Sequence, residues 1–393
     1  MPTDRDFLAA VIADPDTDGP RLIYADWLED RGDESRAEFI RLQCALARLP
    51  AADREHHPDA AREREHWHRH RDDWTRPLDV LLMPGAPAGW LAPIRSAAAA
   101  LAAWPIPTGL AEVARLISGD RWCFRRGFAE ELRARSREFL RAAESIAQAT
   151  PLRSVTLNLS DAGALAAVAD CPQLAGLTCV RLFNEPNGAG QIEPLLSSPH
   201  AARLRRLGLH QFWLSPQELE RLAASPLLTR LEELEISIAG GDAGSRRRLL
   251  SAAAATPSLN RLSLQRFWPE SEAPDVAADW PGSPHLVELD LAWNPLGDCD
   301  LTGLLDRTPA LAALELEGCG LGELAVRSLA RSTRLRQLRS LDLSGNRLTD
   351  SLALELAVSP NLLAGTRLHL RNVELHPSVQ AALRHRFGDQ IRL

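Results

Sequence analysis

The sequence contains no lysine, and all 45 of its basic residues are arginine. Without a lysine amine the chain cannot form a Walker-type phosphate loop, a Schiff base or a lysine general base, because each requires that group. Acidic residues number 52, which gives a formal net charge of −7. This balance disfavours general binding to nucleic acids or anionic membranes, and it favours a partner with a basic surface.

Cysteine is scarce, and long apolar runs are missing. The six cysteines include no C-x-x-C pair, so their spacing indicates neither a zinc site nor a disulfide framework, and we expect reduced thiols. The first residues, MPTDRDFLAAV, lack the basic segment and apolar run of a secretory signal, and no stretch of 18 apolar residues follows. We therefore expect a cytoplasmic protein that uses no cofactor and no metal.

The C-terminal part of the chain repeats one pattern. Residues 338–364, LRSLDLSGNRLTDSLALELAVSPNLLA, contain the L-x-x-L-x-L spacing, then Asn346, then a helical stretch that ends before Pro360. Alternate leucines place their side chains on one face of a short strand, and the helix can cover that face. Because one unit cannot bury its apolar face alone, such units must stack. The pattern starts nine times, at Leu152, Leu177, Leu204, Leu231, Leu259, Leu286, Leu311, Leu338 and Gly365.

This pattern resembles the leucine-rich repeats of the ribonuclease-inhibitor subtype. The resemblance implies an α/β solenoid shaped like a horseshoe, with parallel strands inside and helices outside. That fold hosts inhibitors, receptors, GTPase activators and scaffolds alike, so it does not identify one function. RRGFAEEL at 125–132 and the helical run 137–148 predict an incomplete first unit that caps the solenoid.

The N-terminal residues predict three short helices. Thr3 with Asp6 can cap the first helix, Pro20 can open the second, and Ser35 can begin a capping box for the third. The segments PRLIYADWLEDRGD and AEFIRLQ resemble a short bacterial repeat-companion domain found ahead of leucine-rich and other repeats. This resemblance implies an association with repeats and no biochemical activity.

The chain therefore divides into three expected regions. The helical repeat-companion module covers residues 1–50. Residues 51–124 contain a charged helical segment and an insertion rich in alanine and proline at 83–120, to which we assign no role. The solenoid with its N-terminal cap covers residues 125–393.

Two motifs raise the alternative of a metal-dependent enzyme. Residues 14–19, DPDTDG, read like the opening of a calcium-binding EF-hand loop, but the twelfth position is Ala25 instead of a bidentate glutamate. We favour an acidic turn. His66 and His70 have the i, i+4 spacing of two metal ligands, but nearby arginines would repel a cation. We favour a solvated helix whose tryptophans, Trp67 and Trp74, pack inward.

One position after the strand varies among the repeats, and it holds Phe212, Phe267, Asn294, Cys319 and Asn346. Asparagine there bonds to backbone groups of the turn, and Cys319 is interpreted as structural. We expect the two phenylalanines to fill the same space as a buried spine. Trp213 and Trp268 each follow one of these phenylalanines, and they could either shield the spine or anchor a partner on the rim.

The residues that alternate with the buried leucines form the inner face of the solenoid. They include no Ser-His-Asp set, metal cluster or glycine-rich phosphate loop, but five carboxylates from three adjacent repeats would gather into one patch there. An ordinary solvated face, neutralised by Arg339 or Arg367, is an equally acceptable interpretation. The partner-binding residues that we predict are Glu288, Asp290, Trp293, Glu315, Glu317, Asp342, Trp213 and Trp268.

The predicted function is a non-catalytic protein-interaction module that binds a protein partner on the inner face or rim of the repeats. The first alternative is a GTPase-activating or other regulatory partner of a small GTPase, which would accelerate GTP hydrolysis. The second is a metal-dependent enzyme built on His66, His70 and the acidic loop, which would contain a stoichiometric ion.

Overall fold

The computed structural model describes residues 2–54, 57–83, 121–161, 163–184, 191–237, 240–269 and 280–393. The chain forms two compact units. The first unit comprises Met1–Ser160 and Ala167–Val180, and the second comprises Asp161–Ala166 and Arg181–Leu393. Of the insertion expected at 83–120, all but Met83 lies outside the described residues.

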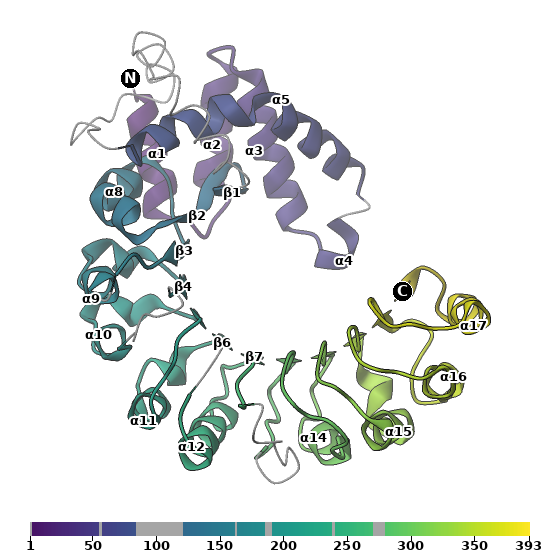
Figure 1. The fold of residues 1–393 in the computed structure, drawn as a ribbon. Coiled ribbons are helices and arrows are strands. Elements are labelled where there is room, and N and C mark those ends of the chain that lie inside the picture. Colours follow the sequence, from purple (N-terminus) through teal and green to yellow (C-terminus); the bar gives the residue numbers. More distant parts are fainter. Residues whose placement is uncertain are drawn as a thin grey trace. The chain divides into compact units, whose positions relative to one another are not determined.

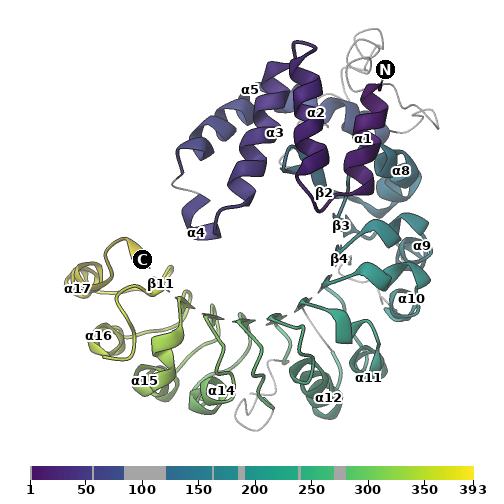
Figure 2. The ribbon, with the colours of Figure 1, turned by 180° about the vertical axis from the view of Figure 1, so that it is seen from behind.

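The first unit begins with three helices that lie side by side (Figures 1 and 2), namely α1 (Asp4–Ala13), α2 (Gly19–Glu29) and α3 (Glu34–Ala47). The expected cap of α1 is confirmed, because the backbone N–H and the hydroxyl of Thr3 donate to Asp6 at 2.7 and 2.8 Å. The capping box expected at Ser35 is wrong. Asp33 caps α3 instead by accepting a hydrogen bond from the N–H of Arg36, which leaves Ser35 inside the helix.

A second set of elements completes the first unit: α4 (Ala51–Arg54), α5 (Pro58–Leu81), β1 (Trp122–Arg125), β2 (Phe128–Arg135), α8 (Ser136–Ala149), β3 (Ser154–Asn158) and η1 (Pro172–Gly176). Helix α9 (Ala164–Ala169) and strand β4 (Cys179–Phe183) cross the division between the units. Strand β2 pairs in parallel with β3, as an incomplete first repeat requires, and antiparallel with β1. Trp67 and Trp74 pack inward as expected, with ring centroids 6.1 and 4.5 Å from that of Phe39.

The N-terminal helices share their core with the hairpin of β1 and β2. Phe128 of β2 belongs to the same buried cluster as Val11 of α1. The Arg21 side chain is fully buried and donates a hydrogen bond to Glu130 of β2 at 2.7 Å. Helices and hairpin therefore form one packed body.

The second unit is a run of strand and helix repeats. In Figure 1 its strands lie along the inner side of an arc, and its longer helices lie along the outer side. Adjacent strands from β5 onward are parallel: β5 (Arg206–His210), β6 (Glu233–Ser237), β7 (Arg261–Gln265), β8 (Glu288–Asp290), β9 (Ala313–Glu315), β10 (Ser340–Asp342), β11 (Arg367–His369) and β12 (Ile391–Arg392).

The helices of the second unit are α10 (Glu193–Leu196), α11 (Pro216–Ala224), α12 (Ala243–Ala254), α14 (Thr302–Asp306), α15 (Glu323–Arg331), α16 (Asp350–Val358) and α17 (Pro377–Phe387), as far as the described residues show them. Short 3₁₀ turns also occur, namely η2 (Pro199–Arg203), η3 (Leu228–Arg230), η4 (Thr333–Gln337) and η5 (Gly388–Gln390). Leu289, Leu314 and Leu341 face one another across β8, β9 and β10 and are buried. The expected α/β leucine-rich repeat solenoid is confirmed.

The variable position after the strand is buried in the five repeats where it holds Phe212, Phe267, Asn294, Cys319 or Asn346. The Asn294 amide donates to the carbonyls of Leu264 and Leu291 at 2.7 and 2.8 Å, and the Asn346 amide donates to those of Leu316 and Leu343 at 2.8 and 3.0 Å. The Cys319 thiol donates to the carbonyl of Leu291 at 3.1 Å, and burial raises its pKa to about 12, so it stays a donor. Phe212 and Phe267 are fully buried, as the expected spine requires.

Candidate partner-binding surface

Three carboxylates form a row across the inner face of the second unit. Asp290 on β8 is in register with Glu315 on β9, which is in register with Asp342 on β10. They lie next to buried leucines in the strands, so they face away from the core. Neighbouring strands are about 4.8 Å apart, and the three charges are therefore close together. We call Asp290, Glu315 and Asp342 the acidic row.

The first end of the row, Asp290, is saturated by this chain's own donors. Its carboxylate accepts hydrogen bonds from the Ser263 hydroxyl at 2.8 Å and the Gln265 amide at 2.6 Å, both on β7. A third hydrogen bond comes from the backbone N–H of Ala292 at 2.9 Å. These donors hold the negative charge of Asp290 without a cation.

The other end of the row, Asp342, is also engaged. Its carboxylate accepts from the backbone N–H of Ser344 at 2.8 Å and lies 3.2 Å from Nδ1 of His369. The Arg371 guanidinium lies 3.8 Å away. The neutralising groups are thus His369 and Arg371, where the sequence suggested Arg339 or Arg367.

The centre of the row differs from its ends. Within the part of the chain that the structure describes, the carboxylates of Glu315 and Glu317 have no hydrogen-bond or ion-pair partner. Glu288, the remaining member of the predicted patch, pairs with Arg261 of β7 at 3.1 Å. The five predicted carboxylates therefore reduce to two uncompensated ones, Glu315 and Glu317, on one strand and the turn after it.

The environment of Glu315 predicts a pH-dependent effect on stability. Loss of hydration and then the charge of Asp290 raise the pKa of Glu315 above its ordinary value. A carboxyl whose folded pKa is raised destabilises the folded state once the pH rises above its unfolded pKa. We expect Glu315→Gln to melt at a higher temperature than the parent at pH 7, and at the same temperature near pH 3. A higher melting temperature at both pH values would contradict an origin in charge.

The predicted tryptophans differ in exposure. Trp268 is only 6% exposed, and its ring packs edge-on against Phe267 with centroids 5.0 Å apart. Its place in the structure is that of a shield for the spine, and it presents little surface to a partner. Trp213 is 66% exposed and Trp293 is 47% exposed, and both follow strands of the second unit. Of these two, Trp293 lies beside the acidic row, since its N–H donates to the carbonyl of Glu317 at 2.8 Å.

A second charged cluster lies on the same face, and sequence reasoning missed it. The Arg181 guanidinium on β4 donates to Glu235 at 3.1 Å and to Glu233 at 3.0 Å, both on β6. His210 on β5 lies 3.1 Å from the same Glu235 carboxylate and stacks on Phe183 with centroids 4.4 Å apart. Burial alone would raise the pKa of Glu235, but hydrogen bonds from its neighbours outweigh it and hold that pKa well below its usual range.

One residue in the sequence, Gly208, could have indicated this cluster. Arg181 reaches across β5 to β6, and Gly208, the β5 residue in register with Glu235, lies under its path. A Cβ at Gly208 would lie 2.9 Å from Cγ of Arg181. A residue without a side chain at an inward-facing strand position was visible in the sequence, and it permits a charge pair between strands that are not neighbours.

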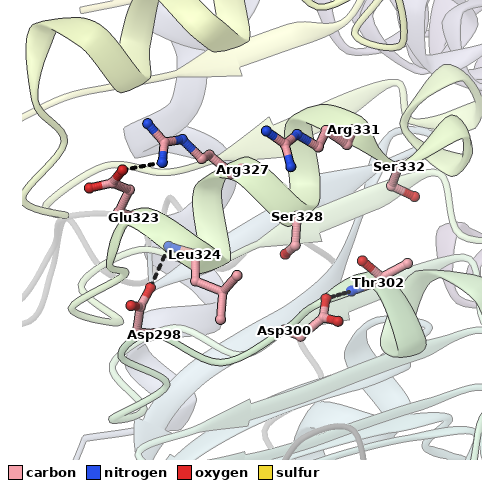
Figure 3. A pocket seen from close by; sticks show the side chains of 9 residues that line it. All are labelled: Asp298, Asp300, Thr302, Glu323, Leu324, Arg327, Ser328, Arg331 and Ser332. Carbon is pink, nitrogen blue, oxygen red and sulfur yellow. Dashed lines mark hydrogen bonds and ion pairs between the residues drawn. The ribbon is translucent and has the colours of Figure 1, made fainter.

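A pocket of about 590 Å³ lies against helix α15 (Figure 3). Asp298 lines it, but its carboxylate already caps α15, accepting from the N–H groups of Leu324 and Ala325 at 2.5 and 3.2 Å. Asp300 likewise accepts from the N–H of Thr302 at 2.8 Å. The carboxylates of Asp298 and Asp300 therefore accept backbone N–H groups of the protein's own helices, α15 and α14.

The residues of the metal alternative bind protein groups instead. His66 Nε2 lies 3.0 Å from a Glu38 carboxylate oxygen, and His70 stacks on Trp74. In the acidic loop, Asp16 pairs with Arg153 at 3.0 Å, and Asp18 pairs with Arg48 at 2.9 Å. Among the described residues, no three His, Cys, Asp or Glu side chains are grouped to hold a metal ion.

Comparison with known proteins supports the repeat assignment. The family model described as "FBD-associated F-box protein At5g56370, LRR repeats" matches residues 219–367. The protein contains leucine-rich repeats. No curated protein matches the sequence. Among the described residues of this leucine-rich repeat protein, no helix has both the length and the apolar character needed to span a bilayer.

Solved structures similar to this chain have low identity. A protein from Bacteroides fragilis is 16% identical with a TM-score of 0.39, and the alignment covers 62% of this chain and 65% of that one. TLR13 in its complex with ssRNA13 is 18% identical with a TM-score of 0.36, and the alignment covers 63% and 32% of the two chains. The C-terminal domain of Caenorhabditis elegans tropomodulin is 13% identical with a TM-score of 0.25, covering 38% and 77%. This chain therefore covers less than two thirds of the length of the Bacteroides fragilis protein and of TLR13.

Proposed function

We propose that the leucine-rich repeats form a non-catalytic module that binds a basic protein surface on the inner face of the second unit. The observation that carries this proposal is the Glu315 carboxylate, which stands between Asp290 and Asp342 with no ion pair or hydrogen bond in the described structure, so that the charge of Arg261 acts on it only from a distance. The ends of the acidic row are compensated by this chain, and its centre is left for a partner.

The physical argument rests on the cost of like charges. Carboxylates on adjacent strands repel one another, and an inward-curving face limits their screening by water. A guanidinium or ammonium group from a partner would turn this repulsion into attraction on binding. Charged residues arranged in this way accelerate association and select partners of opposite charge. Binding should therefore weaken as salt shortens the range of the field, which is about 8 Å at physiological ionic strength.

The test is charge reversal at the uncompensated positions. We expect Glu315→Arg with Glu317→Arg to abolish capture of basic proteins from the native host, while the melting temperature stays equal to or above that of the parent. Reversing these charges removes the attraction and also relieves repulsion within the row. Proteins retained on the immobilised parent and variant chains would be compared by quantitative mass spectrometry.

The matched control reverses the same number of charges elsewhere on the second unit. Glu374 and Asp389 are exposed and lie in turns outside the acidic row. Glu374→Arg with Asp389→Arg should leave capture intact. Equal retention of the same proteins by both double variants would exclude the inner face at β9 as the binding surface.

A further inference from the structure

The turn position just after the strand has a left-handed backbone in six repeats of the second unit. The residues with positive φ that follow the strands of the second unit are Gln211, Arg266, Trp293, Gly318, Gly345 and Asn372. Glycine adopts this conformation freely and asparagine tolerates it, but a large aromatic residue there is a genuine outlier. Trp293 has φ +62°, whereas the next two repeats have glycine at this position. Strained residues of this kind are concentrated at functional sites.

The surroundings of Trp293 accommodate its ring and leave part of it open. A Cβ on Gly318 would lie 2.6 Å from Cε3 of the indole, so the missing side chain of the next repeat provides the space that the ring occupies. The guanidinium of Arg266, from the preceding repeat, lies 5.7 Å from the ring centroid. Nearly half of the Trp293 side chain remains exposed to solvent. The indole is thus held in place by neighbouring turns, and it already accepts one guanidinium of this chain.

We propose that Trp293 is the anchor for an arginine side chain of the partner, with Glu315 and Glu317 neutralising the guanidinium. This inference rests on the proposed function and specifies its partner chemistry. Glu317 is next to Trp293 in the turns that follow β8 and β9, since its carbonyl accepts the Trp293 N–H, and Glu315 precedes Glu317 by two residues at the end of β9. A planar guanidinium can stack on the indole while it donates to two carboxylates.

Arginine is favoured over lysine by this arrangement. Both side chains satisfy the charge of Glu315, but only the flat guanidinium combines ring stacking with several directed hydrogen bonds. A cation over an exposed tryptophan ring contributes about a fivefold gain in affinity. The acidic row therefore provides the attraction to any basic segment, and Trp293 provides the preference for arginine.

The test compares two peptides of equal charge, ten arginines and ten lysines, titrated by fluorescence anisotropy into the full chain. We expect the parent to bind the arginine peptide roughly fivefold more tightly. Trp293→Gly should lose most of this preference, because the ring is lost and only the contacts to the carboxylates remain. Its melting temperature should be equal to or above the parent's, since glycine relieves the left-handed backbone.

Val358→Ala is the control, since it removes an apolar side chain on helix α16 that is 73% exposed, and it should keep the arginine preference. A preference that is absent from the parent, or that survives undiminished in Trp293→Gly, would overturn the anchor. If Glu315→Arg with Glu317→Arg still abolished binding of both peptides, the proposed function would stand without the anchor. No binding of either peptide to the parent would overturn the anchor, and the capture experiment would then judge the proposed function separately.

Discussion

Leu289→Asp should unfold the second unit. Leu289 lies at the middle of β8, in register with Leu262 on one side and Leu314 on the other, and it is 1% exposed. An unpaired carboxylate at this position loses its hydration and finds no partner, which costs several kcal/mol. A domain's whole stability is typically about 5–15 kcal/mol. Thermal denaturation followed by circular dichroism would show loss of the repeat transition or a large decrease in its midpoint.

The matched control is Leu324→Asp, which introduces the same charge on helix α15. Leu324 is 54% exposed, so its aspartate stays hydrated and the melting temperature should change little. If Leu289→Asp melted within a degree or two of the parent, the alternation of buried and exposed residues along β8 would be wrong.

Glu130→Ala should destabilise the first unit by roughly 3–5 kcal/mol, because it removes one partner of a buried ion pair. The Arg21 guanidinium is fully buried and lies 2.7 Å from Glu130. Its remaining hydrogen bonds go to the backbone carbonyls of Pro15, Arg125 and Arg126. These carbonyls do not neutralise a positive charge. Urea unfolding of the full chain would show an earlier transition for the variant.

The neighbouring residue provides the control for this prediction. Glu131 pairs with Arg125, whose side chain is more than half exposed, and such surface pairs contribute about 0–1 kcal/mol. Glu131→Ala should therefore shift the urea midpoint only slightly. Equal shifts for the two alanine variants would show that burial of Glu130 has no special effect. Replacing the pair together, by Arg21→Met with Glu130→Leu, should recover much of the loss, because the Arg21 charge is removed with its partner, and Arg126, which also pairs with Glu130 at 3.3 Å, keeps Asp18 at 3.9 Å.

The repeats could be predicted from the sequence because their signal is periodic. Alternate leucines define the buried face of each strand, and a repeat step of 25 to 28 residues brings Asp290, Glu315 and Asp342 into register. Both inferences need only the side-chain period of a strand and parallel stacking. This part of the fold and the existence of the acidic row followed directly from those two rules.

Lateral contacts between side chains could not be predicted in the same way. The dipeptide Phe-Trp occurs at 212–213 and 267–268, yet only the second tryptophan is buried. Oδ1 of Asn294, in the next repeat, accepts the N–H groups of both Phe267 and Trp268 and draws that turn inward. The difference in burial between Trp213 and Trp268 depends on the following repeat, so the dipeptide sequence alone does not predict it.

Contacts between distant segments were also invisible to periodic reasoning. Arg21 and Glu130 are separated by 109 positions in the chain, and no repeat relates them. Glu288 and Arg261, by contrast, are in register on adjacent strands, so the repeat period does place these two charges opposite each other.

The bond from Arg181 across β5 to Glu235 has a consequence for how the repeats unfold. Solenoid stability is ordinarily a sum of terms for single repeats and for adjacent pairs, so each interface can open by itself. Here the opening of either interface of β5 also disturbs a bond between β4 and β6. This bond adds to the free energy of unfolding a contribution that links two strands that are not adjacent. Strands β4, β5 and β6 should therefore separate as one cooperative block, and a repeat inserted within that block would cost more than one inserted between strands linked only to their immediate neighbours.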